Sequence, residues 1–139
     1  MEQRDYVLRE IERLGYLLAR LRDRILGRIA SAEELRAELH GAARSLGVDL
    51  DMARTVDPET LVLMIGATDV TRRWFFAEAL YLEGLDALYD DRAADASDLL
   101  LRARMLFESL DGQVAAGAIP DLPARLDEID AALGTLPAD

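Results

Sequence analysis

Apolar residues recur three or four positions apart along almost the whole chain, which is the period of an α-helix with one buried face. The clearest case is residues 2–28, where the apolar positions alternate in steps of four and three and form a seam. The seam positions are Val7, Ile11, Leu14, Leu18, Leu21 and Ile25. Because Leu8 and Leu17 flank the seam, its apolar face is wider than that of a strict coiled coil.

This first helix is suited to two roles. At 1.5 Å per residue it is about 40 Å long, longer than a small domain is wide. In the first role, the seam packs on the other helices of the same chain. In the second role, the seam pairs with the seam of a second copy, and the neighbouring arginines contact the acidic surface of that copy. Three heptads lie at the lower limit for a coiled coil. Both roles can hold at once, so the seam is a candidate homodimer interface.

Capping residues and glycines divide the rest of the chain into further helices. A capping box of Ser31 and Glu34 begins a helix that ends at Gly47, a turn or short helix follows at 48–52, and Asp57-Pro58-Glu59 begins a helix that ends near Gly66. The later helices run from Thr68 or Asp69 to Tyr89, from Arg92 to Leu110 before Gly112, and over 122–134 after Asp121. No strand pattern occurs. The sequence predicts one all-α domain over 1–139, a helical bundle or short array of antiparallel helix pairs.

The net charge of −11 is divided unevenly. Residues 1–48 carry nine arginines against eight acidic residues, a net charge of +1, whereas residues 49–139 carry seven against 19, a net charge of −12. An acidic surface repels phosphates, so we expect no nucleic-acid partner. No apolar run approaches the ~20 residues that span a bilayer, and charges from Arg9 to Arg13 interrupt any signal-peptide core. We therefore expect a cytoplasmic protein with no membrane partner.

Residues that commonly carry chemistry are scarce. The chain has no cysteine and one histidine, which excludes disulfides, thiol nucleophiles and multi-histidine metal sites. All 16 positive charges are arginine, a bias typical of a GC-rich bacterial genome. His40 has no nucleophile pattern near it, and we interpret it as a packing or surface residue rather than a general base.

Acidic residues cluster in one part of the chain: Asp86, Asp90, Asp91, Asp95 and Asp98. Their spacing matches neither a calcium loop nor a di-iron bundle, so we interpret them as solvated acids at a turn and helix ends. The sequence thus predicts no catalytic residue, no metal site and no cofactor.

The segment Arg72-Arg73-Trp74-Phe75-Phe76 contains the only tryptophan and two of the three phenylalanines. Five residues span more than one helical turn, so the aromatic side chains cannot share one narrow stripe. We expect one of them to face outward or into a groove. Tryptophan and arginine are typical interface anchors, which makes Arg72, Arg73 and Trp74 a candidate groove; the alternative is that the aromatic residues belong to the core.

Residues 77–110 resemble a tetratricopeptide repeat, in which small and large residues alternate at fixed offsets along a helical hairpin. The matching positions are Leu80, Gly84, Ala96, Leu100 and Ala103. The departures from the pattern are Glu83, Ala87 and Glu108. The resemblance implies a hairpin over about 69–111 whose two helices approach closely at the small residues.

The N-terminus carries a second resemblance. DYVLREI at 5–11, followed by LAR at 18–20, is similar to the opening of a family of uncharacterised bacterial all-helical proteins that begin D-Y-x-x-R-x-I and carry a tetratricopeptide-like hairpin. The segment 57–61 also stands where similar members have a short helix. This resemblance implies a fold and carries over no catalytic residues.

These observations lead us to expect a protein–protein interaction or scaffold module that self-associates, and not an enzyme. The alternative is a small-molecule-binding or enzymatic helical bundle with a pocket near Arg72, Arg73 and Trp74. An enzyme shows an enclosed pocket with convergent polar groups and perturbed pKa values. An interaction module shows an open apolar groove or a symmetric interface.

Overall fold

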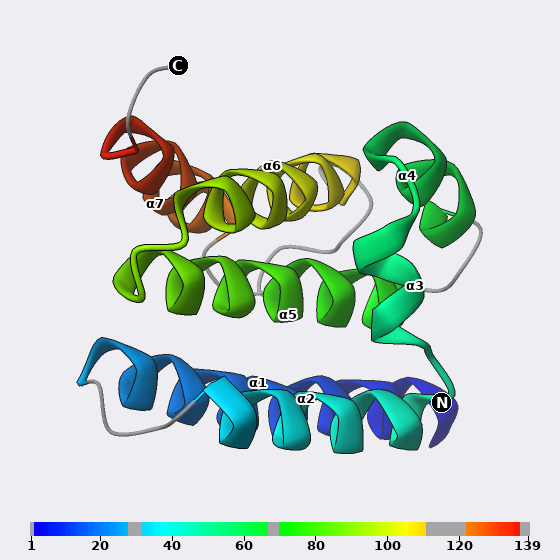
Figure 1. The fold of residues 1–139 in the computed structure, drawn as a ribbon. Coiled ribbons are helices and arrows are strands. Elements are labelled where there is room, and N and C mark those ends of the chain that lie inside the picture. Colours follow the sequence, from blue (N-terminus) through cyan, green and yellow to red (C-terminus); the bar gives the residue numbers. More distant parts are fainter. Residues whose placement is uncertain (1, 28–31, 67–69, 111–121, 137–139) are drawn as a thin grey trace.

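The computed structural model describes residues 2–27, 32–66, 70–110 and 122–136, and these form seven helices and no strand (Figure 1). The helices are α1 (Glu2–Leu26), α2 (Ala32–Leu46), α3 (Leu50–Thr55), α4 (Pro58–Gly66), α5 (Val70–Tyr89), α6 (Ala93–Ser109) and α7 (Leu122–Gly134). The predicted all-α fold is confirmed.

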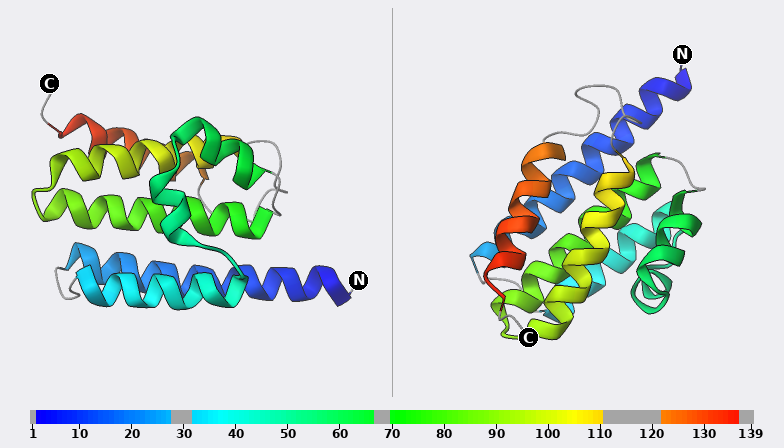
Figure 2. Two further views of the ribbon diagram at one scale, coloured as in Figure 1. Left: turned by 45° about the vertical axis from the view of Figure 1, so that its right-hand side comes forward. Right: turned by 90° about the horizontal axis from the view of Figure 1, so that it is seen from above.

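The helices lie in layers around α5 (Figures 1 and 2). The antiparallel pair α1 and α2 forms one layer, α5 runs along the middle, and α6 and α7 lie on the opposite side. The short helices α3 and α4 lie at one end of the molecule, beside α5 and α6. This arrangement places α5 in contact with every other helix layer.

Central position explains why α5 is buried on all sides. Every residue over 73–85 is buried, including the charged residues Arg73, Glu78 and Glu83. Trp74, Phe75 and Phe76 are 3%, 0% and 2% exposed. We predicted that one of these aromatic side chains faces outward or into a groove. The outward orientation is wrong, because neighbouring helices cover this part of α5 on both sides.

Local capping explains several helix ends. Gly47 has φ +72°, its N–H donates to the Arg44 carbonyl, and the Val48 N–H donates to the Ala43 carbonyl. These two bonds form a Schellman motif, which favours glycine in the left-handed position. Gly47 therefore ends α2 as predicted.

The start of α4 also follows its sequence signal. The Asp57 carboxylate accepts hydrogen bonds from the backbone N–H of Thr60 at 3.0 Å and from its hydroxyl at 2.6 Å, and Pro58 is the first helical residue.

Other predicted boundaries differ slightly from the structure. The first helix ends at Leu26 rather than at residue 28, and α6 spans Ala93–Ser109 rather than 92–110. The last helix begins and ends where predicted. The proposed caps and terminators at Ser31, Thr68, Asp69, Gly112 and Asp121 lie outside the described residues.

Helices α5 and α6 form an antiparallel hairpin and pack along most of their length. A Cβ atom on Gly84 would lie 2.8 Å from side-chain atoms of Leu100, so only glycine permits this approach. The hairpin's resemblance to a tetratricopeptide repeat stays a prediction.

Candidate functional site

The seam of α1 packs inside the chain. Leu14, Leu18, Leu21 and Ile25 are 8%, 3%, 1% and 4% exposed and belong to the common hydrophobic core. The side chains of Val7 and Ile11 lie outside the described residues. The chain's own helices thus occupy the described part of the seam, and pairing of this seam with a second copy stays a prediction.

The residues of the predicted groove have separate positions. Arg72 Nε donates to the Leu46 carbonyl at the end of α2 (2.9 Å), and Arg73 Nη1 donates to the Ser109 carbonyl at the end of α6 (3.5 Å). A cation at a helix C-terminus complements the helix dipole. Both arginines therefore stabilise helix ends, while Trp74 lines a cavity to which neither of them contributes.

Trp74 lines what we call the α1–α5–α7 cavity, which has a volume of about 260 Å³. Its lining residues are Gly15, Leu18, Ala19, Arg22, Asp23, Trp74, Glu78, Ala124, Arg125 and Glu128. Gly15 is opposite the tryptophan, where a Cβ atom would lie 3.6 Å from Trp74 Cη2. Small side chains on α1 and α7 thus leave open the space that the cavity occupies.

A buried ion pair forms one wall of this cavity. The side chain of Glu78 is 6% exposed, and Arg125 Nε donates to its Oε1 at 3.0 Å. Burial raises the pKa of Glu78, and the attraction of Arg125 only partly opposes this effect. Burial disfavours the charged form of Arg125, but the combined effects of Glu78, Tyr81 and Glu128 outweigh it and raise the pKa of Arg125.

Glu128 joins the three helices that surround the cavity. Its Oε2 accepts hydrogen bonds from Arg22 at 2.9 Å, the Tyr81 hydroxyl at 2.6 Å and Arg125 at 2.8 Å. Burial would raise the pKa of Glu128, but these donors outweigh it and lower the pKa. Burial and the bond to Glu128 raise the pKa of Tyr81 to about 12. The Arg125 guanidinium also lies 4.8 Å from the centre of the Tyr81 ring.

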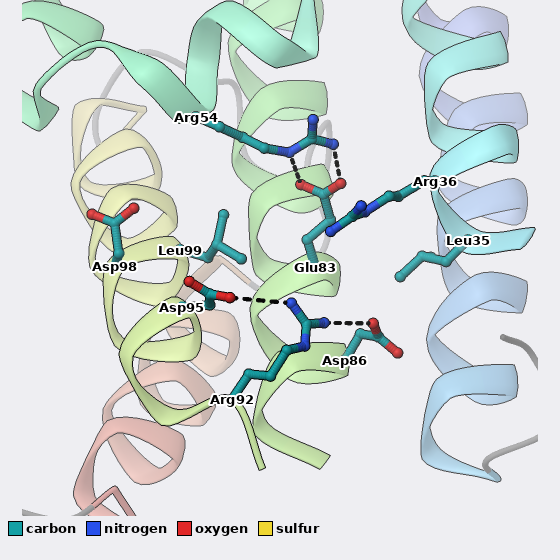
Figure 3. A pocket seen from close by; sticks show the side chains of 9 residues that line it. All are labelled: Leu35, Arg36, Arg54, Glu83, Asp86, Arg92, Asp95, Asp98 and Leu99. Carbon is teal, nitrogen blue, oxygen red and sulfur yellow. Dashed lines mark hydrogen bonds and ion pairs between the residues drawn. The ribbon is translucent and has the colours of Figure 1, made fainter. Parts of the chain in front are cut away.

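A second cavity of about 220 Å³, the α2–α3–α5–α6 cavity, lies on another side of α5 (Figure 3). Its lining residues are Leu35, Arg36, Arg54, Glu83, Asp86, Arg92, Asp95, Asp98 and Leu99. Arg54 binds both oxygens of Glu83, with Nε 2.8 Å from Oε2 and Nη2 in contact with Oε1. Arg92 binds Asp86 at 3.2 Å and Asp95 at 3.3 Å.

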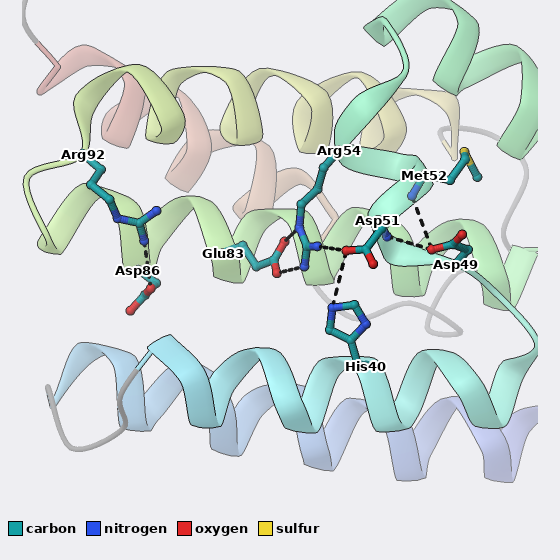
Figure 4. Close-up of polar contacts among 8 residues, drawn as sticks. All are labelled: His40, Asp49, Asp51, Met52, Arg54, Glu83, Asp86 and Arg92. Carbon is teal, nitrogen blue, oxygen red and sulfur yellow. Dashed lines mark hydrogen bonds and ion pairs between the residues drawn. The ribbon is translucent and has the colours of Figure 1, made fainter.

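A polar chain connects α2 to α5 through α3 (Figure 4). His40 Nε2 lies 3.7 Å from Asp51, Asp51 lies 2.6 Å from Arg54, and Arg54 binds Glu83. Asp49 caps α3 by accepting from the backbone of Asp51 and Met52. His40 is half-buried between helices, consistent with a packing or surface histidine.

The clustered acids are paired mainly with arginines. Arg92 contacts Asp86, Asp90 and Asp95, and Arg102 contacts Asp98 at 2.9 Å. Burial raises the pKa of Asp86. Within the described ranges, no group of three His, Asp or Glu residues is placed to hold a metal ion.

The outward face of α1 is the third feature, and we define it as Arg9, Arg13, Tyr16, Ala19 and Arg20. Tyr16 is 84% exposed, the highest value among the exposed large apolar side chains. Arg13 and Arg20 form no hydrogen bond or ion pair with any residue whose side chain the structure describes, which leaves out the side chains of residues 2–8, 10 and 11. By contrast, Arg22 and Arg24 on the flanks of the helix pair with acids of α7 and α2.

Our sequence reasoning missed Glu78 and Arg125. A signal for the glutamate was present, because Glu78 and Glu83 interrupt a run of aromatic and aliphatic residues over 74–85. Charged residues are rarely buried without a partner, so such an interruption indicates a buried ion pair. No local pattern identifies Arg125 as that partner, since it follows Glu78 by 47 residues.

Comparison of the chain with protein-family models, with curated proteins and with solved structures finds no match. None of the described helices is long and apolar enough to cross a membrane.

Proposed function

We propose that the protein is an interaction module whose outward α1 face binds a second copy of the same chain. The observation that carries this proposal is the exposure of Tyr16 between two arginines that have no acidic partner in the described chain. Tyrosine and arginine dominate the residues that contribute most to protein interfaces. Removing both guanidinium groups from water is unfavourable unless acidic residues of a partner pair with them. A partner for this face must therefore supply acidic residues.

Charge complementarity supports a second copy as the partner. Residues 1–48 have a net charge of +1 and residues 49–139 a net charge of −12, so each copy offers an acidic surface to the arginines of the other. Two-fold symmetry lets both copies make this contact at once. The proposal thus moves self-association from the seam to the opposite face of the same helix.

Sedimentation velocity at 1–100 µM protein tests the proposal. We expect reversible self-association at tens of micromolar in low salt that weakens at high salt, because exposed charge pairs are screened. Tyr16→Ala and the double variant Arg13→Glu/Arg20→Glu should each weaken association by at least about tenfold, as expected of central interface residues.

Leu63→Ala is the matched control, since Leu63 is 78% exposed but lies on α4. Association should be unchanged in this variant. A wild-type protein that stays monomeric at 100 µM, or one whose association is insensitive to both α1 variants, would overturn the proposal. Seam variants such as Leu14→Asp cannot replace these tests, because they bury a charge in the core and destabilise the fold itself.

A further inference from the structure

The α1–α5–α7 cavity contains carboxylate oxygens that the described residues do not bind. Arg125 occupies Oε1 of Glu78, but Oε2 has no hydrogen bond to a described residue. The carboxylate of Asp23, which also lines the cavity, has none either. Arg22 Nε is a donor without a partner, but it has no accessible surface and cannot serve a ligand in the cavity.

The charge of the lining favours a cation. Three carboxylates, those of Asp23, Glu78 and Glu128, face two guanidinium groups, those of Arg22 and Arg125. Both guanidinium groups already bind carboxylates of the cavity. A ligand that brings one positive charge neutralises the lining, whereas an anion would meet an excess of negative charge.

The opposite wall is apolar. Trp74 and Leu18, each 3% exposed, border the cavity, and Ala19 and Ala124 complete this side. Such a wall favours a ligand with an apolar part, because contact between them removes apolar surface of both the wall and the ligand from water. A volume of about 260 Å³ accommodates a molecule with a single ring.

We propose that the α1–α5–α7 cavity is a binding site for a small primary amine with an apolar body. The ammonium group donates to Oε2 of Glu78, and the hydrocarbon body packs against Trp74 and Leu18. Oε2 of Glu78 is not among the fully buried atoms without a partner, so it retains accessible surface at which the ammonium group can donate to it. Of the outward α1 face only Ala19 also lines this cavity. Arg13, Tyr16 and Arg20, on which the proposed self-association depends, do not line it, so the two proposals are tested separately.

The only tryptophan of the chain borders this cavity, so its indole N–H resonance in ¹H–¹⁵N NMR reports on the site directly. The probes are benzylammonium, benzyl alcohol and benzoate, which share one ring and carry charges of +1, 0 and −1. We expect benzylammonium to shift the Trp74 indole resonance saturably, with a Kd at least tenfold below that of benzyl alcohol. Benzoate should not bind.

Two pairs of variants locate the site. Glu78→Gln should weaken benzylammonium binding at least tenfold, whereas Glu83→Gln, an equally buried glutamate on the same helix, should leave it unchanged. Gly15→Leu should fill the cavity and abolish binding. Gly41→Leu is its control, because a Cβ at Gly41 meets nothing within 4 Å.

Binding of benzoate as tight as that of benzylammonium would overturn the proposal, and so would the absence of any saturable shift with benzylammonium. Equal loss of binding in Glu78→Gln and Glu83→Gln would place the ligand elsewhere and also overturn it. If Gly15→Leu does not fold, as judged by circular dichroism, the two glutamine variants still decide the question.

Discussion

The two buried glutamates of α5 differ in how fully their carboxylates are satisfied, although both side chains are 6% exposed. Arg54 binds both oxygens of Glu83, while Arg125 binds only one oxygen of Glu78. Bidentate pairs hold geometry as well as charge. The comparison teaches that a cavity lies beside each buried glutamate of α5, but only the Glu78 carboxylate keeps an oxygen that its arginine does not bind.

Glycines on the same two sides show the same difference. A Cβ on Gly84 would lie 2.8 Å from Leu100, whereas a Cβ on Gly15 would lie 3.6 Å from Trp74, which is ordinary van der Waals contact. Gly84 is required for close packing of α5 on α6. Gly15 leaves space that the α1–α5–α7 cavity occupies.

Removing the arginine partners should give the largest contrast. Arg54→Ala leaves Glu83 buried without a partner, and we expect a loss of about 3 kcal/mol in the free energy of unfolding. Arg125→Ala should cost about 2 kcal/mol, because Oε2 of Glu78 already lacks a protein donor. Urea denaturation measures both values. Equal losses would mean that the two ion pairs do not differ in stability.

Neutralising the glutamates sharpens the comparison. Glu83→Gln places an amide N–H₂ against the Arg54 donors and should cost about 2 kcal/mol at pH 7. Glu78→Gln loses one charged hydrogen bond but also relieves the burial of a charge, so the cost should stay below about 1 kcal/mol. Urea denaturation of both variants checks this order, and a reversed order would contradict the comparison.

Alanine substitutions at the two glycines should change the stability by smaller amounts, and the two changes should have opposite signs. Gly84→Ala forces a methyl group against Leu100 and should destabilise the protein by about 1 kcal/mol after the gain in helix propensity. Gly15→Ala has room for its methyl group and should stabilise by about 0.5 kcal/mol. Thermal unfolding monitored by circular dichroism measures both. Destabilisation by Gly15→Ala would show that the space near Trp74 is not available.

The smallest expected effect is on the pH dependence of stability. Burial raises the pKa of Glu78 above the ordinary 4.5, against the attraction of Arg125 and Arg22, so the folded state holds its proton more tightly than the unfolded state. The stabilisation that comes from this tighter proton binding is fully present below pH 4.5, and it is lost as the pH rises through the raised pKa of Glu78. We therefore expect the free energy of unfolding of Glu78→Gln to rise relative to that of the wild type as the pH rises. Urea denaturation between pH 4 and 7 measures this difference. A constant difference between them would contradict the raised pKa.

The fold was predictable to a large extent because its signals are local. The alternation from Leu14 to Ile25 predicts the buried face of α1, and Gly47 and Asp57 predict two helix boundaries through backbone hydrogen bonds made within a few residues. Exposure of individual aromatic side chains was not predictable in this way. It depends on how many layers cover α5, which no segment of the sequence specifies by itself.

The cavity was not predictable because its parts come from distant segments. Glu78 pairs with Arg125 across 47 residues, and Arg54 pairs with Glu83 across 29. Among the residues of the predicted groove, Trp74 lines the α1–α5–α7 cavity, whereas Arg72 and Arg73 do not line that cavity and bind helix carbonyls. A glutamate in an apolar helix indicates a buried pair, but only the packing of α7 on α5 determines its partner.

Three arginines bind carbonyls at the ends of other helices: Arg72 at the end of α2, Arg102 at the end of α3 and Arg73 at the end of α6. Helix ends usually fray independently, whereas these ends are held by side chains of α5 and α6. Local opening of α5 or α6 therefore releases the last turns of several helices together. Amide hydrogen exchange should show these turns exchanging as one cooperative unit with the α5–α6 hairpin.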